Sequence, residues 1–308
     1  MIWMELNKST YHVPVLLNEC VEGLRIQPEG TYVDVTFGGG GHAQSIFKKL
    51  SKGGTLVAFD QDKEALQNTW EAENFHFIQS NFTFLKNQLK RAGHPIVDGI
   101  LADLGVSSHQ FDTEGRGFTL RVDAPLDMRM NQQAALSAKQ VLNDYSEEDL
   151  LRVFRSYSDL TNARKIVHAI VLRRASSPLI STGDLIESVS NCTPKVKPHK
   201  FLAQLFQAIR IEVNDEMGAL RNLLEQSKDC LRIGGRIVVI SYHSIEDRMV
   251  KNFFKKGSVD GKETKDFFGN LLKPFTEINR KPIVPSEEEM VQNSRSRSAK
   301  LRIAERNA

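Results

Sequence analysis

Four consecutive glycines between an acid and a histidine are the first stretch of the sequence whose composition indicates chemistry. Asp34 precedes the glycine run 38–41, and His42 follows the run directly. Glycines allow a backbone to approach a ligand closely, and the N-terminus of a following helix favours anionic or carboxylate groups. A tight turn that binds nothing has the same composition, so the run predicts a binding site only in combination with other residues.

Two further acids stand where such a site would need them. Asp60 comes 19 residues after Gly41 and directly follows an apolar segment, and Asp103 directly follows another. An acid in the first position accepts the two ribose hydroxyls of an adenosine cofactor. An acid in the second position accepts hydrogen bonds from a target amine or holds the ammonium group of the cofactor. The alternatives are a helix N-cap for Asp60 and a strand-end cap for Asp103.

Short apolar, β-branched segments that alternate with helical patterns position these acids. The alternation predicts βαβ units, a parallel sheet and helices on both of its faces. The acids then lie at the carboxyl ends of the strands, where ligands bind in such sheets. The predicted strands are 31–35, 55–59, 75–79 and 99–101, and the predicted helices between them are 42–50 and 63–71.

A different pattern occupies the middle of the chain. Residues 106–127 are rich in glycine, aspartate, serine and arginine and are expected to form a long functional loop. Residues 134–190 show only helical periodicity, and a further helix is predicted at 201–224. The middle of the chain therefore predicts an all-helical domain inserted into the sheet domain.

Strand patterns return after this block. Residues 231–241 form the next predicted strand, and alternating apolar residues at 298–305 predict a half-exposed antiparallel strand, with a loop expected at 255–286. The sheet is therefore completed by the C-terminal part of the chain. The predicted domains are a discontinuous sheet domain, residues 1–110 and 208–308, and a helical insert, residues 111–207.

The identity of the cofactor depends on how the sheet ends and on the glycine turn. NAD and S-adenosylmethionine both bind to this topology. Four adjacent glycines in place of G-x-G-x-x-G, an acid at Asp34, and a predicted antiparallel pairing of 237–241 with 300–303 favour S-adenosylmethionine. Phe82, after the third strand, has two interpretations, a ring against adenine or a core residue. We therefore predict a Rossmann-like S-adenosylmethionine-dependent methyltransferase sheet with an inserted all-helical domain.

Charge is distributed unevenly along the chain. Residues 1–150 hold 13 basic and 20 acidic residues, whereas residues 151–210 hold 10 basic and 3 acidic ones. A basic block on an otherwise acidic chain predicts a polyanionic partner that touches part of the molecule, and a solvated helical face is the alternative. The basic residues expected on helical faces are Arg152, Arg155, Arg164, Lys165, Arg173 and Arg174.

Several classes of protein are excluded by composition. The sequence contains no run of 18 apolar residues, so no membrane-spanning helix is predicted. Residues 1–14 do not resemble a secretory signal. The three cysteines lie far apart without metal-type spacing, which predicts neither a disulfide scaffold nor a bound metal and fits a reducing, cytoplasmic location.

Motifs along nearly the whole chain resemble one family, the ribosomal RNA small subunit methyltransferase H family of the MraW type. Several are long and idiosyncratic, so the similarity is specific. The motifs are residues 12–19 (HVPVLLNE), 32–42 (YVDVTFGGGGH), 103–108 (DLGVSS), 116–118 (RGF), 125–130 (PLDMRM), 206–211 (FQAIRI), 241–248 (SYHSIEDR) and 293–298 (NSRSRS). The sequence departs from the family pattern at 157–160, at 199–204 and at Asn131.

The resemblance implies a function and a set of residues. Members of this family methylate N4 of cytidine 1402 of 16S ribosomal RNA, in the decoding region of the small ribosomal subunit, with S-adenosyl-L-methionine as cofactor. The helical insert matches the part of the family expected to recognise RNA. The oligomeric state stays open, with a homodimer among the compatible assemblies. The implied cofactor contacts are Gly40, Gly41, His42, Asp60, Phe82, Asp103 and Gln110.

Catalysis is less well specified by the sequence than cofactor binding. Asp103 is the one catalytic candidate, and no general base is assigned. A ring that stacks on the target cytosine is sought among Phe111, Phe118, Tyr242 and His243.

Two other functions stay open, a non-enzymatic RNA-binding or assembly factor and a small-molecule methyltransferase. The glycine run with Asp60 and Asp103 argues against the first. The basic insert with Arg295 and Arg297 argues against the second.

Overall fold

The computed structural model describes residues 14–307, which divide into two compact units. The first unit comprises the residues up to Gly105 and those from Leu220 onward, and the second is Val106–Ala219. The helical insert predicted at 111–207 falls inside the second unit, which extends beyond it at both ends. The predicted absence of a secretory signal and the first two residues of the motif at 12–19 concern residues outside the described part of the chain.

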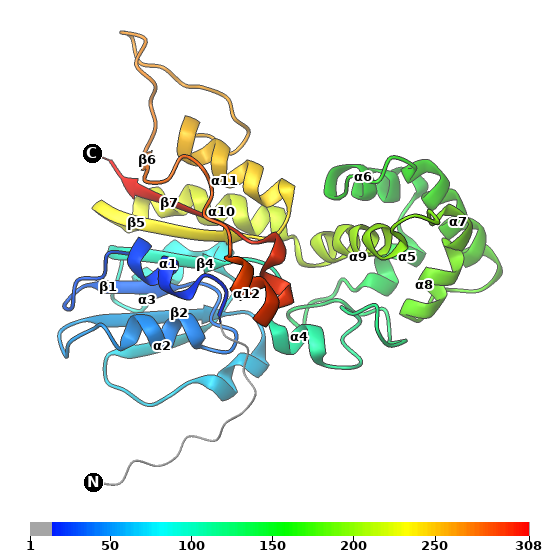
Figure 1. Ribbon diagram of the computed structural model, residues 1–308, viewed down its shortest axis with the longest axis horizontal. Helices are drawn as coiled ribbons and strands as arrows, with labels where there is room; N and C mark the ends of the chain where they lie inside the picture. The colour runs from blue at the N-terminus through cyan, green and yellow to red at the C-terminus, as the bar shows by residue number, and fades with distance from the viewer. Residues whose placement is uncertain (1–13, 308) are drawn as a thin grey trace. The chain divides into compact units, whose positions relative to one another are not determined.

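A single mixed sheet forms the centre of the first unit (Figure 1). Its strand order is β3-β2-β1-β4-β5-β7-β6. Strands β1 to β5 pair in parallel, and β7 lies antiparallel between β5 and β6. The strands are β1 (Thr31–Asp34), β2 (Thr55–Asp60), β3 (Phe75–Gln79), β4 (Val97–Asp103), β5 (Leu231–Ser241), β6 (Phe275–Glu277) and β7 (Lys300–Arg306).

This order creates a switch point between β1 and β4. The chain proceeds outward from β1 through β2 to β3 and then returns to the other side of β1, so the connections on the two sides of the β1–β4 pair run in opposite directions. Ligands bind outside the carboxyl ends of the strands at such a point. The predicted antiparallel pairing of 237–241 with 300–303 is confirmed, because Ser241 lies opposite Lys300 and Val238 opposite Ile303.

Apolar residues on alternate strand positions bury one face of the sheet under α1 and α2 (Figure 1). Cys20 and Ile46 from these helices pack with Leu101, Val238 and other strand residues in one buried cluster. None of the helices within residues 14–307 is both long and apolar enough to cross a membrane. The helices of this unit are α1 (Leu17–Gly23), α2 (Gly41–Phe47), α3 (Leu85–Arg91), α10 (Glu216–Cys230, whose first residues belong to the second unit), α11 (Ser244–Lys256) and α12 (Glu287–Gln292), with 3-10 helices η1 (Lys63–Asn68), η2 (Phe82–Phe84) and η4 (Ser294–Ser298).

Three predicted segments differ in the structure. The helix predicted at 63–71 is the short 3-10 helix η1, in which Ala65 is the buried residue, so the segment has no apolar stripe to support an α-helix. The loop expected at 255–286 contains β6. The helix predicted at 201–224 is broken at Asp215, whose left-handed backbone (φ 46°) ends one helix, while Gly218 leaves room for its carboxylate.

The second unit is a bundle of short helices around its own core. Buried Val153, Phe154, Ile166 and Ile209 belong to one apolar cluster with residues of the neighbouring helices. The loop expected at 106–127 contains one short helix, α4. The helices are α4 (Ser108–Asp112), α5 (Ala138–Asp144), α6 (Glu147–Tyr157), α7 (Ala163–Ser176), α8 (Thr182–Ser188) and α9 (Pro198–Asn214), with the 3-10 helix η3 (Ser190–Cys192).

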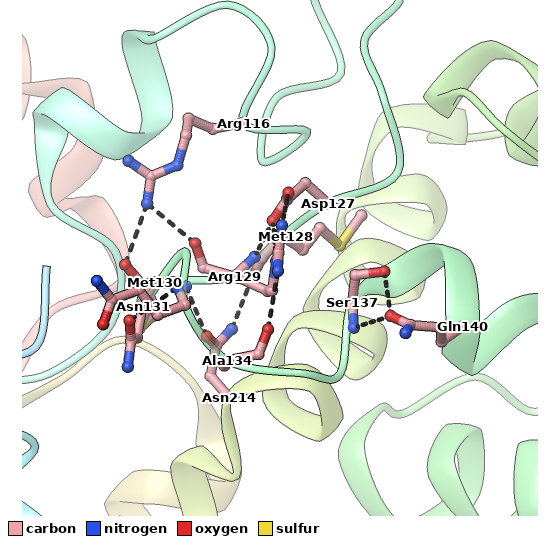
Figure 2. A network of polar contacts seen from close by, with 11 residues as sticks. Arg116, Asp127, Met128, Arg129, Met130, Asn131, Ala134, Ser137, Gln140 and Asn214 are labelled. Atoms are coloured by element: carbon pink, nitrogen blue, oxygen red, sulfur yellow. Dashed lines mark hydrogen bonds and ion pairs between the residues drawn. The ribbon is translucent and has the colours of Figure 1, made fainter.

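Polar side chains hold the long loop between α4 and α5 (Figure 2). The Arg116 guanidinium donates to the carbonyls of Arg129 (2.9 Å) and Met130 (3.1 Å). Arg129 in turn forms a paired contact with the Asp127 carboxylate at 2.7 and 2.9 Å. The Asn214 amide donates to the carbonyl of Met128 and accepts from the N–H of Met130. The motifs at 116–118 and 125–130 therefore stabilise the fold of the second unit.

We expect Asn214→Ala to destabilise the second unit. The change leaves one carbonyl and one N–H of the loop without their partners beside the buried Met128 and Met130 side chains, which costs about 2–4 kcal/mol in the free energy of unfolding. Urea denaturation and amide exchange of residues 116–131 measure this loss.

Asn131→Ala is the matched control for this experiment. The Asn131 side chain accepts one exposed hydrogen bond, from the N–H of Gln133. The free energy of unfolding of Asn131→Ala should therefore lie within about 0.5 kcal/mol of that of the unsubstituted chain. Equal stability of the two variants would show that the Asn214 contacts do not hold the loop.

Candidate functional site

Three aspartates end three neighbouring strands of the sheet. Asp34 is the last residue of β1, Asp60 of β2 and Asp103 of β4. Because β2, β1 and β4 are adjacent and parallel, the three carboxylates lie along one edge. The structure thus brings together acids that the sequence places at the ends of separate strands.

A threonine joins the ends of the two central strands. The Thr36 hydroxyl accepts a hydrogen bond from the N–H of Asp103 at 2.7 Å and lies 3.4 Å from the Asp34 carboxylate, to which it donates. Asp34 also accepts from the N–H of Thr36 at 3.0 Å. This link fixes the spacing of the β1 and β4 ends where a ligand would enter.

Asp60 organises the glycine turn from the next strand. One carboxylate oxygen accepts from the N–H of Gly38 at 2.7 Å, and the other accepts from the N–H of Asp62 at 2.8 Å. The N-cap of the following 3-10 helix is Asp62, so the alternative that Asp60 caps that helix is wrong. A backbone hydrogen bond from Gln61 also acts on this carboxylate, and since a carboxylate has about four lone-pair sites, Asp60 can accept from a further donor.

The glycines of the turn are also required by packing. Gly40 has a left-handed backbone (φ 76°), and a side chain there would meet the Phe37 ring at 3.0 Å. A Cβ at Gly41 would lie 2.3 Å from the Pro14 side chain. The turn therefore needs both glycines for its own closure, in addition to any ligand that approaches it.

Asp103 has one oxygen held by the protein and one that is open. The Tyr242 hydroxyl donates to Oδ1 at 2.8 Å. Within residues 14–307, Oδ2 accepts no hydrogen bond, and His42 Nδ1 lies 3.7 Å from it. Because His42 Nε2 lies 3.0 Å from the carbonyl of Val15, Nε2 carries the ring proton, and the neutral ring presents a lone pair toward Asp103. A donor that enters beside Oδ2 is therefore favoured.

Burial raises the pKa of each of these carboxyls. The pKa of Asp103 rises to about 7, chiefly through burial, against the lowering effect of the Tyr242 hydrogen bond. Burial raises the pKa of Asp34 to about 6, partly offset by His42, and that of Asp60 to about 6, partly offset by backbone N–H groups. Burial also lowers the pKa of His42. In the described part of the chain none of the three acids pairs with a lysine or arginine.

The other predicted site residues occupy several parts of the fold. Phe82 begins η2, after Asn81, whose amide bonds to Gln61 and so joins the ends of β2 and β3. Gln110 is buried in the second unit, where its side chain completes a capping box with Ser107, and its role toward a cofactor stays a prediction.

All four candidate stacking rings have partners within the protein. Phe118 is buried in the core of the second unit, and His243 caps α11 through Glu246. Phe111 packs partly buried against the core of the second unit. The Tyr242 hydroxyl is bound to Asp103. The sequence did not predict the hydrogen bonds of Thr36 and Tyr242 to Asp103, although both residues directly follow predicted strands, which is a signal for this edge of the sheet.

The strand order and the acids at the carboxyl ends of β1, β2 and β4 define a Rossmann-like methyltransferase. The chain belongs to the MraW methylase family, whose model matches residues 9–307.

Similar proteins named "Ribosomal RNA small subunit methyltransferase H" match the chain over nearly their full lengths. The protein from Amoebophilus asiaticus is 53% identical over 304 residues, which cover 97% of each chain. That from Bacteroides fragilis is 51% identical over 303 residues, 98% of this chain and 100% of the relative. That from Flavobacterium johnsoniae is 53% identical over 296 residues, 96% and 98% of the two chains.

We expect Tyr242→Phe to raise the pKa of Asp103 above its value of about 7. The hydroxyl stabilises the ionised carboxylate, so its removal favours the protonated form. Carboxyl carbon NMR titration, with Asp103→Asn to assign the signal, measures the change. Tyr32→Phe is the control, because the Tyr32 hydroxyl accepts from the N–H of Gln27 instead. An unchanged Asp103 titration in Tyr242→Phe would contradict the proposed electrostatic role.

Proposed function

We propose that this protein transfers a methyl group from S-adenosyl-L-methionine to N4 of cytidine 1402 of 16S ribosomal RNA in the small ribosomal subunit. Membership of the methylase family and the names of the relatives support the reaction and the substrate class. The single observation that carries the proposal is the open oxygen of Asp103, at the switch point, beside a glycine turn and two further acids.

The charge of the edge favours this cofactor over NAD. Three desolvated carboxylates without basic partners are more favourable beside a cation than beside an anion. S-adenosylmethionine carries a sulfonium and an ammonium group, whereas the pyrophosphate of NAD is anionic. When bound, the cofactor supplies an electrophilic methyl group.

The protein residues present fit this cofactor. Asp60 retains acceptor capacity for a ribose hydroxyl, while hydrogen bonds from backbone N–H groups, among them those of Gly38 and Asp62, keep the carboxylate oriented. In addition to Asp60 and Asp103, the family resemblance proposes Gly40, Gly41, His42, Phe82 and Gln110 as cofactor contacts.

Asp103 acts on the amine by orientation. The N4 lone pair of cytosine is conjugated with the ring, so transfer requires the amine to be turned toward the methyl group. An ionised Asp103 accepts a hydrogen bond from N4–H at Oδ2, while Tyr242 holds Oδ1 in place. A strong base is not required, because the methylated nitrogen loses its proton readily. The cytidine must be unpaired or flipped to reach this edge.

Asp60→Ala should weaken binding of S-adenosylmethionine strongly. The change removes up to two charge-assisted hydrogen bonds, each worth about 1.5–3 kcal/mol. Calorimetric titration with the cofactor measures the loss, and Asp62→Ala, which removes the side-chain cap of η1 and leaves the Asp60 carboxylate in place, serves as control. Equal affinities for the two variants would argue against the ribose assignment.

Asp103→Asn separates the two roles open to this carboxylate. If Asp103 orients N4, the variant should retain its cofactor affinity and lose about 10- to 100-fold in kcat, because the amide lacks the charge and binds donors more weakly. If Asp103 instead holds the ammonium group, cofactor affinity should fall. Unchanged affinity and unchanged kcat would leave the residue as a strand-end cap.

RNA binding is proposed for basic residues of the second unit, with one correction to the predicted set. Arg173 is bound to Asp184 and to the carbonyl of Ser177, and Arg174 donates to the carbonyl of Leu142, so both support the fold. Arg152 pairs with Glu212. Arg155, Arg164 and Lys165 are exposed without such partners among the described residues.

The exposed residues at the start of α7 have basic neighbours. Asn162 donates to the carbonyl of Cys192 at 3.0 Å, which joins the start of α7 to the end of η3. The exposed Lys195 follows in the connector to α9. Arg164, Lys165 and Lys195 are therefore the proposed phosphate-binding group.

Neutralising this group should reduce the salt dependence of RNA binding. If all three residues meet phosphates, replacing Arg164, Lys165 and Lys195 by Gln should lower the log–log salt slope by about 2–3 and leave cofactor affinity intact. The control replaces three exposed lysines of the first unit, Lys48, Lys49 and Lys52, with the same change in charge. Identical slopes for both triple variants would reject this surface.

The reaction itself is tested by nucleoside mass analysis. 16S ribosomal RNA and small subunits from cells that lack the enzyme are incubated with isotope-labelled S-adenosylmethionine and digested. A labelled N4-methylcytidine at position 1402 is the expected product. Binding of RNA without methyl transfer would favour a non-enzymatic assembly factor, and transfer only to small molecules would favour a small-molecule methyltransferase.

A further inference from the structure

Two phenylalanines stand exposed at the end of a hairpin between α11 and β6. Phe267 is 97% exposed and Phe268 is 84% exposed. Figure 1 shows this segment, in orange, projecting from the sheet and helices of the first unit. The described residues of that unit do not cover either ring.

The hairpin that carries the rings is well defined by backbone contacts. Lys265 pairs with Leu271 in an antiparallel bridge. The N–H of Leu272 donates to the carbonyl of Thr264 at 2.8 Å. The exposure of the rings is therefore a property of an ordered hairpin.

The turn at the end of the hairpin holds the backbone that carries the two rings. The Asp266 carboxylate accepts from the N–H groups of Phe268 (2.9 Å) and Asn270 (2.8 Å), and Gly269 adopts the left-handed backbone (φ 85°) that closes the turn. The rings meet edge to face with centroids 5.6 Å apart. Rings held in place bind a partner with less loss of conformational entropy than mobile ones.

The charge around the rings favours a polyanion. Residues 251–273 contain six basic and three acidic residues. Of the acids, Asp260 pairs with Arg221, and Asp266 is used in the turn. Glu263 pairs with two of the lysines, at 3.8 Å from Lys256 and 3.9 Å from Lys265, so the net excess of three basic residues remains. Aromatic rings beside lysines are the combination that binds unpaired nucleic acid, because rings stack on bases while cations meet phosphates.

The hairpin leaves the sheet far from the acidic edge. Phe275 of β6 lies opposite Arg306, at one end of β7, whereas Lys300 at its other end lies opposite Ser241, next to Tyr242. The length of β7 puts about 20 Å between these ends. The hairpin is therefore attached to the sheet at the end opposite the acidic edge.

We propose that Phe267 and Phe268 stack on unpaired bases of the ribosomal RNA at a place remote from the target cytidine. The inference rests on the proposed function, since it assumes an RNA substrate larger than the target loop. The hairpin is then a second docking element, which affects substrate affinity and leaves the transfer step unchanged.

The test compares four variants on two RNA probes, with small ribosomal subunits and phosphatidylglycerol vesicles as further probes. Phe267→Ala with Phe268→Ala should weaken binding of a full-length 16S ribosomal RNA transcript about fivefold or more and raise KM with kcat unchanged. Binding of a short RNA hairpin around the target should not change. Phe267→Tyr with Phe268→Tyr should restore binding, and the double leucine variant should not. Ile233→Ala, at another exposed apolar residue of the first unit (69%), is the control.

Four results would overturn the inference. If the double alanine variant binds the protein-free transcript as well as the unsubstituted chain does, the rings do not contact RNA. If its binding is weaker only for the complete small subunit, the rings contact a ribosomal protein. If the double alanine variant loses binding only to phosphatidylglycerol vesicles, the rings contact a membrane. If the double leucine variant binds the transcript fully, the rings make an apolar contact and do not stack on bases. Filter binding does not depend on methylation, so ring-dependent binding without transfer would contradict the proposed function and leave the docking element standing.

Discussion

The desolvated carboxylates at the ends of β1, β2 and β4 are the constraint on which the site depends. Their pKa values, raised to between about 6 and 7, mean that the folded chain binds protons more tightly than the unfolded chain does above the ordinary aspartate value. These carboxyls therefore lower the stability of the first unit as the pH rises from the ordinary aspartate pKa of 3.8 to the raised values of about 6 to 7. Thr36, Gly38 and Tyr242 offset part of this cost with hydrogen bonds to the carboxylates. A cationic ligand would offset more of this cost, so the proposed cofactor would stabilise the site to which it binds.

Sequence patterns predict the parts of this site that depend on strand ends. The apolar segments before Asp34, Asp60 and Asp103 locate each acid at a carboxyl end, and the parallel sheet then brings them together. Contacts between strands were not predictable in the same way. Thr36 bonds a residue 67 positions away, and Tyr242 one that is 139 positions away, because strand order places their strands side by side. No local pattern encodes that order.

Local structure was mispredicted where one residue outweighs the periodic pattern. The helical pattern at 201–224 continues without interruption, but Asp215 adopts a left-handed backbone and divides it into α9 and α10. Gly218 makes that break sterically feasible, since a side chain there would collide with the Asp215 carboxylate. The motifs at 116–118 and 125–130 likewise have polar residues typical of binding, and these residues hold a long loop by internal hydrogen bonds (Figure 2).

The proposed chemistry and the proposed substrate make opposite electrostatic demands on the chain. Orientation of an amine requires a desolvated acid, whereas an RNA backbone is repelled by one. Residues 1–150 carry the excess of acids, and the basic excess lies in residues 151–210 and again around the hairpin at 251–273. Separation along the chain allows phosphates to be bound by groups that do not neutralise Asp103. A lysine or arginine close enough to attract phosphate to the acidic edge would also lower the Asp103 pKa and occupy Oδ2, the oxygen that the amine requires. The proposed function therefore favours phosphate contacts from residues other than those of the acidic edge, and affinity for a large RNA from several such contacts.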